Sequence, residues 1–127
     1  MSVTNPSNPD LNLEQLLANE TLLTMPEVAD KLGIVVTRAH DLLTERKIIA
    51  WRKDGVRYVP EAFFNEKNAV SKFVSGVITV LSDGGYSDDE ILHHLFTEDE
   101  SLPGRPIDAL HGHLAREVIR RAQAMAF

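Results

Sequence analysis

The hydrophobic residues in the first half of the chain recur first at a helical spacing and then at a strand-like spacing. From Thr24 they return every three or four positions, and Glu27 three residues after Thr24 is typical of a helix start. Gly33 ends that helix, and the same spacing predicts a second helix over residues 36–46. The pattern therefore predicts two short helices joined by a glycine turn.

The period changes to two after the second helix. Residues 49–52 and 56–59 read as short strands, and Asp54-Gly55 lies between them. Asp-Gly between two such runs is a strong signal for a β-hairpin. We expect Trp51, the only tryptophan, to anchor this hairpin on the core, with stacking on nucleic acid as the alternative.

The second half reads as helical. We expect one helix over residues 70–82 and another that begins at Ser87, with Glu90 in the position of a capping box. Pro106 opens a last helix, which the apolar spacing extends to the end of the chain as one continuous element.

These elements predict a mainly α fold with one small β-hairpin, a winged helix-turn-helix followed by a C-terminal helical bundle. We expect residues 1–10, rich in Pro, Asn and Ser, to be a disordered tail. Residues 11–65 are expected to form the winged helix-turn-helix domain. Residues 66–127 are expected to form a C-terminal helical domain packed on it.

Composition removes several classes of protein. The 127 residues contain no cysteine, which excludes disulfide scaffolds, thiol catalysis and cysteine-based metal sites. No apolar run approaches the roughly 20 residues that a membrane helix needs. Residues 1–10 contain no Lys or Arg, so we expect no secretory signal and a cytoplasmic protein that does not bind membranes.

Charge is unevenly distributed along the chain. The net charge is −6, which for the whole chain argues against nucleic acid as a partner. Residues 24–60, however, carry a net charge of +2, and five of their seven bases fall within residues 46–57. Residues 61–104 carry −7. Clustering of this kind also fits an ordinary solvated surface.

The order helix, glycine turn, helix and basic hairpin is typical of a winged helix-turn-helix that binds double-stranded DNA. The second helix is slim enough to enter the major groove, and a basic hairpin lies where phosphates run. Acidic regions elsewhere do not oppose DNA binding if they face away from the DNA. The candidate DNA-binding residues are Thr37 and Arg38 for the groove, with Arg46, Lys47, Arg52, Lys53 and Arg57 for phosphates.

The second helix is poorly equipped to read bases. Arg38 is its only early base, Asp41 repels phosphate, and Val35 stands where a capping Ser or Thr is expected. We therefore expect modest affinity dominated by phosphate contacts. The alternative is a protein–protein interaction module, in which residues 83–100 and the last helix bind a partner and the winged helix is vestigial.

The runs that carry a family resemblance cover nearly the whole chain beyond the tail. Residues 23–33 and 57–60 are similar to the helix-turn-helix of excisionase and MerR-type proteins. Residues 81–97 and 105–126 resemble a small actinobacterial family of winged helix-turn-helix DNA-binding proteins that have a C-terminal domain of unknown function.

This resemblance implies DNA binding by the winged domain. It also implies control by phosphorylation of a threonine in the N-terminal tail, because the mycobacterial member is a substrate of a membrane serine/threonine protein kinase. Thr4 is the only threonine in the tail and becomes the candidate by position. The tail is shorter than the mycobacterial one, so no residue matches one to one. Loss of this regulation is the alternative. The sequence leaves the oligomeric state open.

Other chemistry finds little support in the sequence. His93 and His94 are adjacent and point to different sides of a helix, and His111 and His113 also diverge, so we expect no metal site. No nucleophile motif or phosphate loop is present, so we expect no cofactor and no enzymatic activity. The acidic residues 88–90 open a helix, where negative charge is favourable without any catalytic role.

Overall fold

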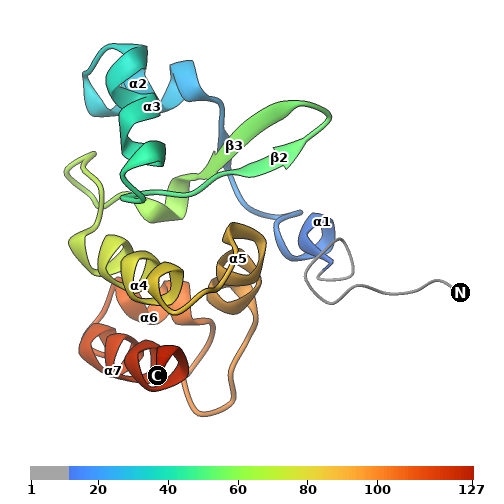
Figure 1. Cartoon of the computed structure of the whole chain (residues 1–127), viewed down its shortest axis with the longest axis vertical. Helices are drawn as coiled ribbons and strands as arrows, with labels where there is room; N and C mark the ends of the chain where they lie inside the picture. The colour runs from blue at the N-terminus through green and yellow to red at the C-terminus, as the bar shows by residue number, and fades with distance from the viewer. Residues whose placement is uncertain (1–11) are drawn as a thin grey trace, which may run out of the picture.

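The computed structural model describes residues 12–127, which form a winged region above a layer of helices (Figure 1). The expected tail and Thr4 lie outside the described residues. The elements, in chain order, are α1 (Leu13–Leu16), β1 (Leu22–Leu23), α2 (Met25–Leu32), α3 (Val36–Thr44), β2 (Trp51–Lys53), β3 (Val56–Pro60), the 3₁₀ helix η2 (Glu61–Phe63), α4 (Lys72–Asp83), α5 (Asp88–Phe96), α6 (Pro106–Leu110) and α7 (Ala115–Ala126).

Helices α2 and α3 confirm the predicted pair joined by a glycine turn. The backbone N–H of Thr24 donates to the Glu27 carboxylate at 2.8 Å, so the predicted capping interaction is present. Gly33 ends α2 with a φ of 70°, a left-handed conformation that costs glycine little. Helix α3 ends at Thr44 rather than at residue 46, because Arg46 takes a φ of 60° and turns the chain.

The predicted hairpin is present and belongs to a three-stranded antiparallel sheet of order β1-β3-β2. Asp54 and Gly55 both have positive φ, which suits a tight turn between twisted strands. Strand β1 was not predicted, because it has two residues and is recognisable only by its pairing with β3. The mainly helical class with a small β element is confirmed.

The single last helix predicted from Pro106 onward is wrong. The chain leaves helical geometry after Leu110 and restarts at Ala115, giving α6 and α7. An uninterrupted helix of some 20 residues would extend about 30 Å and carry one of its halves away from the bundle. The break lets both α6 and α7 pack against α4, which a periodic apolar pattern alone does not reveal.

One continuous core joins the winged region to the helices. Phe63 of η2 meets Phe96 of α5 with ring centroids 6.2 Å apart. Arg105 adds a polar link, since it donates to Glu20 at 2.6 Å and also to Asp108. Within residues 12–127, no helix is long and apolar enough to cross a membrane.

Close packing of α4 on α7 gives a stability prediction. A Cβ added at Gly84 would lie 2.6 Å from the Cβ of Ala126 and 2.8 Å from its Cα, whereas one at Gly76 would meet only Ile119 at 3.9 Å. We expect Gly84→Ala to lower the free energy of unfolding by about 1–3 kcal/mol through overpacking. The matched control, Gly76→Ala, should raise it by up to about 1 kcal/mol. Urea denaturation checks both, and equal effects would contradict the packing described.

The link through Arg105 gives a second prediction. The side chain of Glu20 is only 14% exposed, so Arg105→Met leaves a largely buried carboxylate unpaired and should cost about 1–2 kcal/mol. The hydrogen bond from Arg105 lowers the pKa of Asp108, so the Arg105–Asp108 contact stabilises the fold fully above about pH 4 and less below it. The deficit of the variant should therefore shrink as the pH falls below that value.

Thermal unfolding between pH 3 and pH 7 measures this effect. The matched control is Arg120→Met, which removes a more exposed ion pair with Glu117. It should change stability much less than Arg105→Met. Equal losses for the two variants would show that Arg105 does not join the two halves.

Candidate nucleic-acid interface

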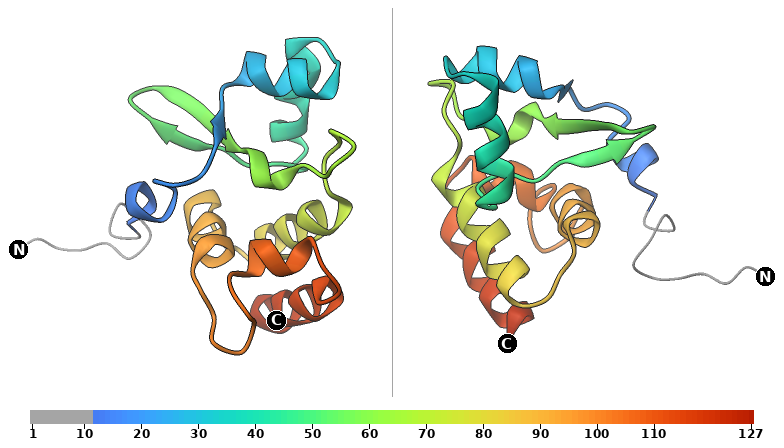
Figure 2. Two further views of the ribbon diagram at one scale, coloured as in Figure 1. Left: turned by 180° about the vertical axis from the view of Figure 1, so that it is seen from behind. Right: turned by 45° about the horizontal axis from the view of Figure 1, so that its top comes forward.

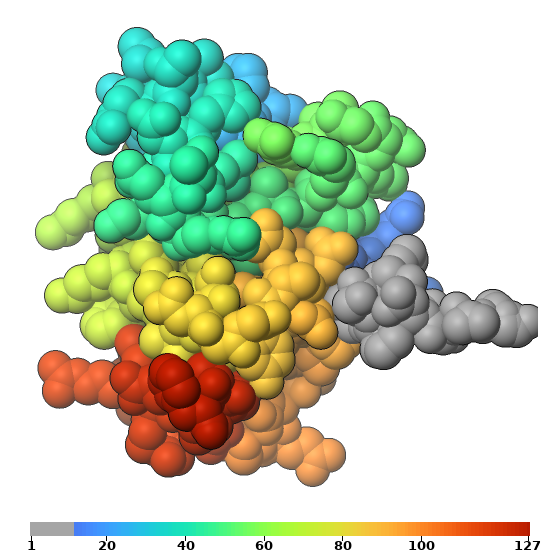
Figure 3. Space-filling view, in the orientation of Figure 1, coloured from blue at the N-terminus to red at the C-terminus, as the bar shows by residue number. Residues whose placement is uncertain are grey.

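The first residues of α3 are exposed on the same face of the molecule as the wing, the β2–β3 hairpin of residues 51–60 (Figure 3). Val35 and Val36 are 65% and 40% exposed, while Ala39, one helical turn further along, is buried. Thr37 and Arg38 are exposed beside the valines. The leading edge of α3 therefore offers mainly van der Waals contact and a single base.

The wing places two arginines directly opposite each other. Arg52 and Arg57 are register partners in the antiparallel pair, so their side chains share one face, and both are exposed. No ion pair or side-chain hydrogen bond joins either of them to the rest of residues 12–127. Like charges opposite each other destabilise a hairpin, and an external anion removes that repulsion.

The opposite face of the wing packs on the molecule. Trp51 and Tyr58 are register partners with ring centroids 6.5 Å apart, and Trp51 is half-buried against the core. This agrees with the expected anchoring role. Lys53 shares that face and lies over the Trp51 ring. Its ammonium group donates to Glu14 of α1 at 2.9 Å, and this hydrogen bond raises the pKa of Lys53. Figure 2 shows α1 below the wing.

The other predicted DNA-binding residues differ in whether their side chains already form ion pairs within the molecule. Arg38 forms an exposed ion pair with Asp41 at 3.4 Å, a contact of the weak surface kind. Arg46 forms an ion pair with Asp88 of α5. The side chain of Lys47 is exposed, and its backbone carbonyl accepts a hydrogen bond from the Ser75 hydroxyl of α4 at 2.6 Å.

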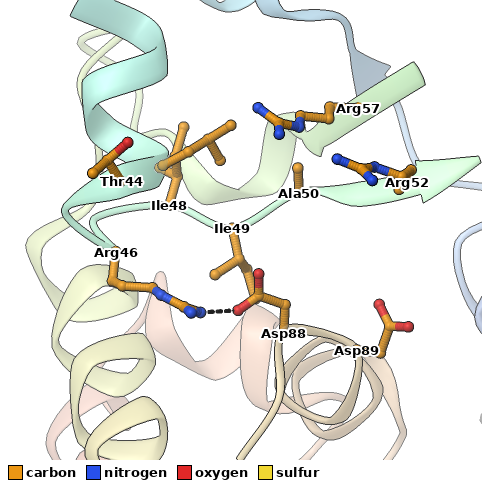
Figure 4. Close-up of a pocket in the computed structure, with 10 residues that line it drawn as sticks. Thr44, Arg46, Ile48, Ile49, Ala50, Arg52, Arg57, Asp88 and Asp89 are labelled. Carbon is orange, nitrogen blue, oxygen red and sulfur yellow. Dashed lines mark hydrogen bonds and ion pairs between the residues drawn. The ribbon is translucent and has the colours of Figure 1, made fainter. Parts of the chain in front are cut away.

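A hollow of about 430 Å³ brings three of these residues together (Figure 4). Arg52 and Arg57 reach into it from the wing, and Arg46 reaches it from the turn after α3. The remaining lining residues are Leu43, Thr44, Ile48, Ile49, Ala50, Asp88 and Asp89.

The condition that acidic residues face away from the basic surface is not met at this hollow. Asp88 and Asp89, at the first turn of α5, lie opposite the wing arginines. Burial and the neighbouring Asp88 charge raise the pKa of Asp89. From the sequence, these carboxylates were explained only by the favourable position of negative charge at the start of a helix. No local signal indicates that residue 88 lies beside residue 46.

The histidines do not form a metal site in the described part of the chain. Residues 12–127 contain no group of three or more His, Asp or Glu side chains placed to hold a metal ion. Burial lowers the pKa of His94, and its Nε2 atom has no hydrogen-bond partner within these residues.

Comparisons with known proteins agree with this arrangement. Residues 10–64 match the family model described as the wHTH domain of DNA-binding protein Rv2175c, and residues 71–126 match the Rv2175c C-terminal domain of unknown function. DNA-binding protein Rv2175c of Mycobacterium tuberculosis is 42% identical over 121 residues, covering 86% of this chain and 83% of that protein. The NMR structure of Rv2175c superposes with a TM-score of 0.80 at 38% identity, covering 100% of this chain and 87% of that chain. The chain therefore belongs to the Rv2175c family of winged helix-turn-helix proteins.

Proposed function

We propose that this protein binds double-stranded DNA and catalyses no reaction. The observation that carries the proposal is the exposed pair Arg52 and Arg57, which share one face of the wing without an ion-pair partner in residues 12–127. Two phosphates of a DNA strand supply the missing negative charge and release their counterions on binding. The relative named a DNA-binding protein supports the same conclusion.

In this proposal α3 enters the major groove while the wing holds the backbone. Thr37 and Arg38 lie on the exposed start of α3, where side chains reach base edges in helix-turn-helix proteins. Val35 and Val36 add apolar contacts but no hydrogen bonds. Lys47, next to the turn after α3, supplies a further phosphate contact. Affinity is therefore expected to come mainly from phosphates, with limited reading of sequence.

Binding of this kind suits a transcriptional regulator or a nucleoid-associated factor that works in the cytoplasm. The hollow is lined by arginines and aspartates whose opposite charges face each other. A protein–protein interaction module is the conclusion only if DNA binding is absent at low salt.

The wing arginines give a direct prediction. We expect Arg52→Ala/Arg57→Ala to weaken binding of a mixed-sequence duplex by at least about tenfold, because two phosphate contacts are lost. The slope of log K against log salt concentration should become shallower by about 2, since each lost contact removes about 0.9. Fluorescence anisotropy between roughly 50 and 200 mM salt measures both quantities.

The matched control removes two positive charges elsewhere. Lys67→Ala/Arg116→Ala changes the net charge equally at exposed positions outside the winged region. This control should leave affinity within about twofold and the slope unchanged. Equal losses in the two double variants would mean that net charge, not the wing, controls binding. Absence of binding by the wild type at 50 mM salt would overturn the proposed function.

We also propose that a serine/threonine protein kinase controls DNA binding through Thr4. Glu14 is joined to Lys53 of the wing, and Thr4 lies ten positions before Glu14 in the sequence. A segment of that length spans at most about 35 Å, so Thr4 is within reach of the DNA surface. A phosphate group adds nearly two negative charges there and repels the DNA backbone.

Substitution of Thr4 tests this regulation. We expect Thr4→Glu to weaken DNA binding relative to Thr4→Ala, by about twofold to fivefold because Glu carries less charge than phosphate. The difference should shrink as salt screens the added charge. Equal DNA affinity of the two variants at 50 mM salt would mean that charge at this position does not regulate the protein.

A further inference from the structure

Arg46 occupies an unusual position at the end of the recognition helix α3. The backbone N–H of Lys47 bonds to the Leu42 carbonyl at 2.9 Å, and that of Arg46 bonds to the Leu43 carbonyl at 3.1 Å. This is the Schellman pattern, in which the residue at the position of Arg46 is usually glycine. Here an arginine takes the left-handed φ of 60°, so the turn carries a long cationic side chain.

The backbone on each side of the ion pair between Arg46 and Asp88 is held in place. After Arg46, the chain is tied by the Ser75 hydroxyl and by burial of Ile48 and Ile49. Asp88 is the first residue of α5, which Ser87 caps. The ion pair therefore joins two rigid parts of the molecule rather than two flexible segments (Figure 4).

The ion pair also lies inside the hollow that contains the unpartnered wing arginines. Arg46 is thus the third base of a surface that otherwise presents Arg52 and Arg57. Asp88 neutralises it, and Asp89 brings a second negative charge to the same hollow. DNA phosphates approaching the wing meet two aspartates from the C-terminal helices.

We propose that Asp88 limits the DNA affinity of this protein by holding Arg46 away from the phosphates, so that α5 determines how many bases contact DNA. This inference rests on the proposed DNA binding and adds a role for the C-terminal helical region. Asp88 acts through Arg46 and is a positioning residue, while Asp89 adds repulsion. A different sequence at the first turn of α5 would give a tighter DNA-binding protein.

The expected size of the effect follows from exposure. The side chains of Arg46 and Asp88 are 47% and 42% exposed, so their attraction is that of a weak surface pair. Removing the carboxylate frees one base and removes one repulsive charge beside the phosphates. We expect Asp88→Asn to tighten DNA binding by about threefold to tenfold.

A salt titration of the full chain on a mixed-sequence duplex tests the inference. Asp88→Asn should steepen the slope of log K against log salt concentration by about 1, because Arg46 gains a phosphate. The matched control is Glu100→Gln, which removes one negative charge from the exposed acidic loop. It should change affinity by less than about twofold and leave the slope unchanged. Asp88→Ser is a second variant with the same expected result, since serine also suits the start of a helix.

Combining Asp88→Asn with Arg46→Gln separates the proposed action of Asp88 on Arg46 from a general effect of charge. The double variant Asp88→Asn/Arg46→Gln should return to the wild-type slope, because the freed base is gone. The inference is overturned if Asp88→Asn behaves like Glu100→Gln, or if the steeper slope persists in the double variant. DNA binding by the wild type with no gain in Asp88→Asn overturns this inference alone. Absence of binding by every variant at 50 mM salt overturns the proposed function as well.

Discussion

Ile48 and Ile49 connect the recognition helix to the wing and are almost completely withdrawn from water. Their burial fixes the short segment between α3 and β2 on the core, so α3 and the wing keep one relative position. Two polar contacts reinforce the segment, from Ser75 of α4 and from Asp88 of α5. The C-terminal helices are therefore part of the framework that positions the candidate interface. Burial of two such side chains stabilises by about 3–6 kcal/mol in total, more than any surface ion pair described here.

The distribution of charge explains how a protein of net charge −6 can present a DNA-binding surface. The wing directs Arg52 and Arg57 to one face and places Trp51 and Tyr58 on the other, because side chains alternate along a strand. Salt screens charges that lie more than a Debye length apart, about 8–10 Å at moderate salt. The charges nearest the phosphates, rather than the net charge of the whole protein, therefore determine whether a surface attracts DNA. Asp88 and Asp89 line the same hollow as Arg52 and Arg57, so in the proposed binding mode the start of α5 faces the DNA backbone.

Helix ends and turns were predictable from the sequence because interactions between residues close along the chain determine them. The capping residues of α2 and α5, the turn at Gly33 and the Asp54-Gly55 hairpin all lie where the sequence signals them. The element that was missed and the one that was predicted wrongly both depend on partners far along the chain. Strand β1 exists because β3 lies beside it, and the last helix breaks because both of its halves pack on α4.

The candidate site shows the same division between local and distant interactions. The sequence by itself determined which residues are basic and that a hairpin follows two helices, because helix spacing and turn chemistry act over a few residues. Only the tertiary structure decided which of the basic residues are free. It pairs Lys53 with Glu14 and Arg46 with Asp88, at separations of 39 and 42 residues. Those pairings result from packing the two halves on one core, and no local pattern specifies which surfaces that packing brings together.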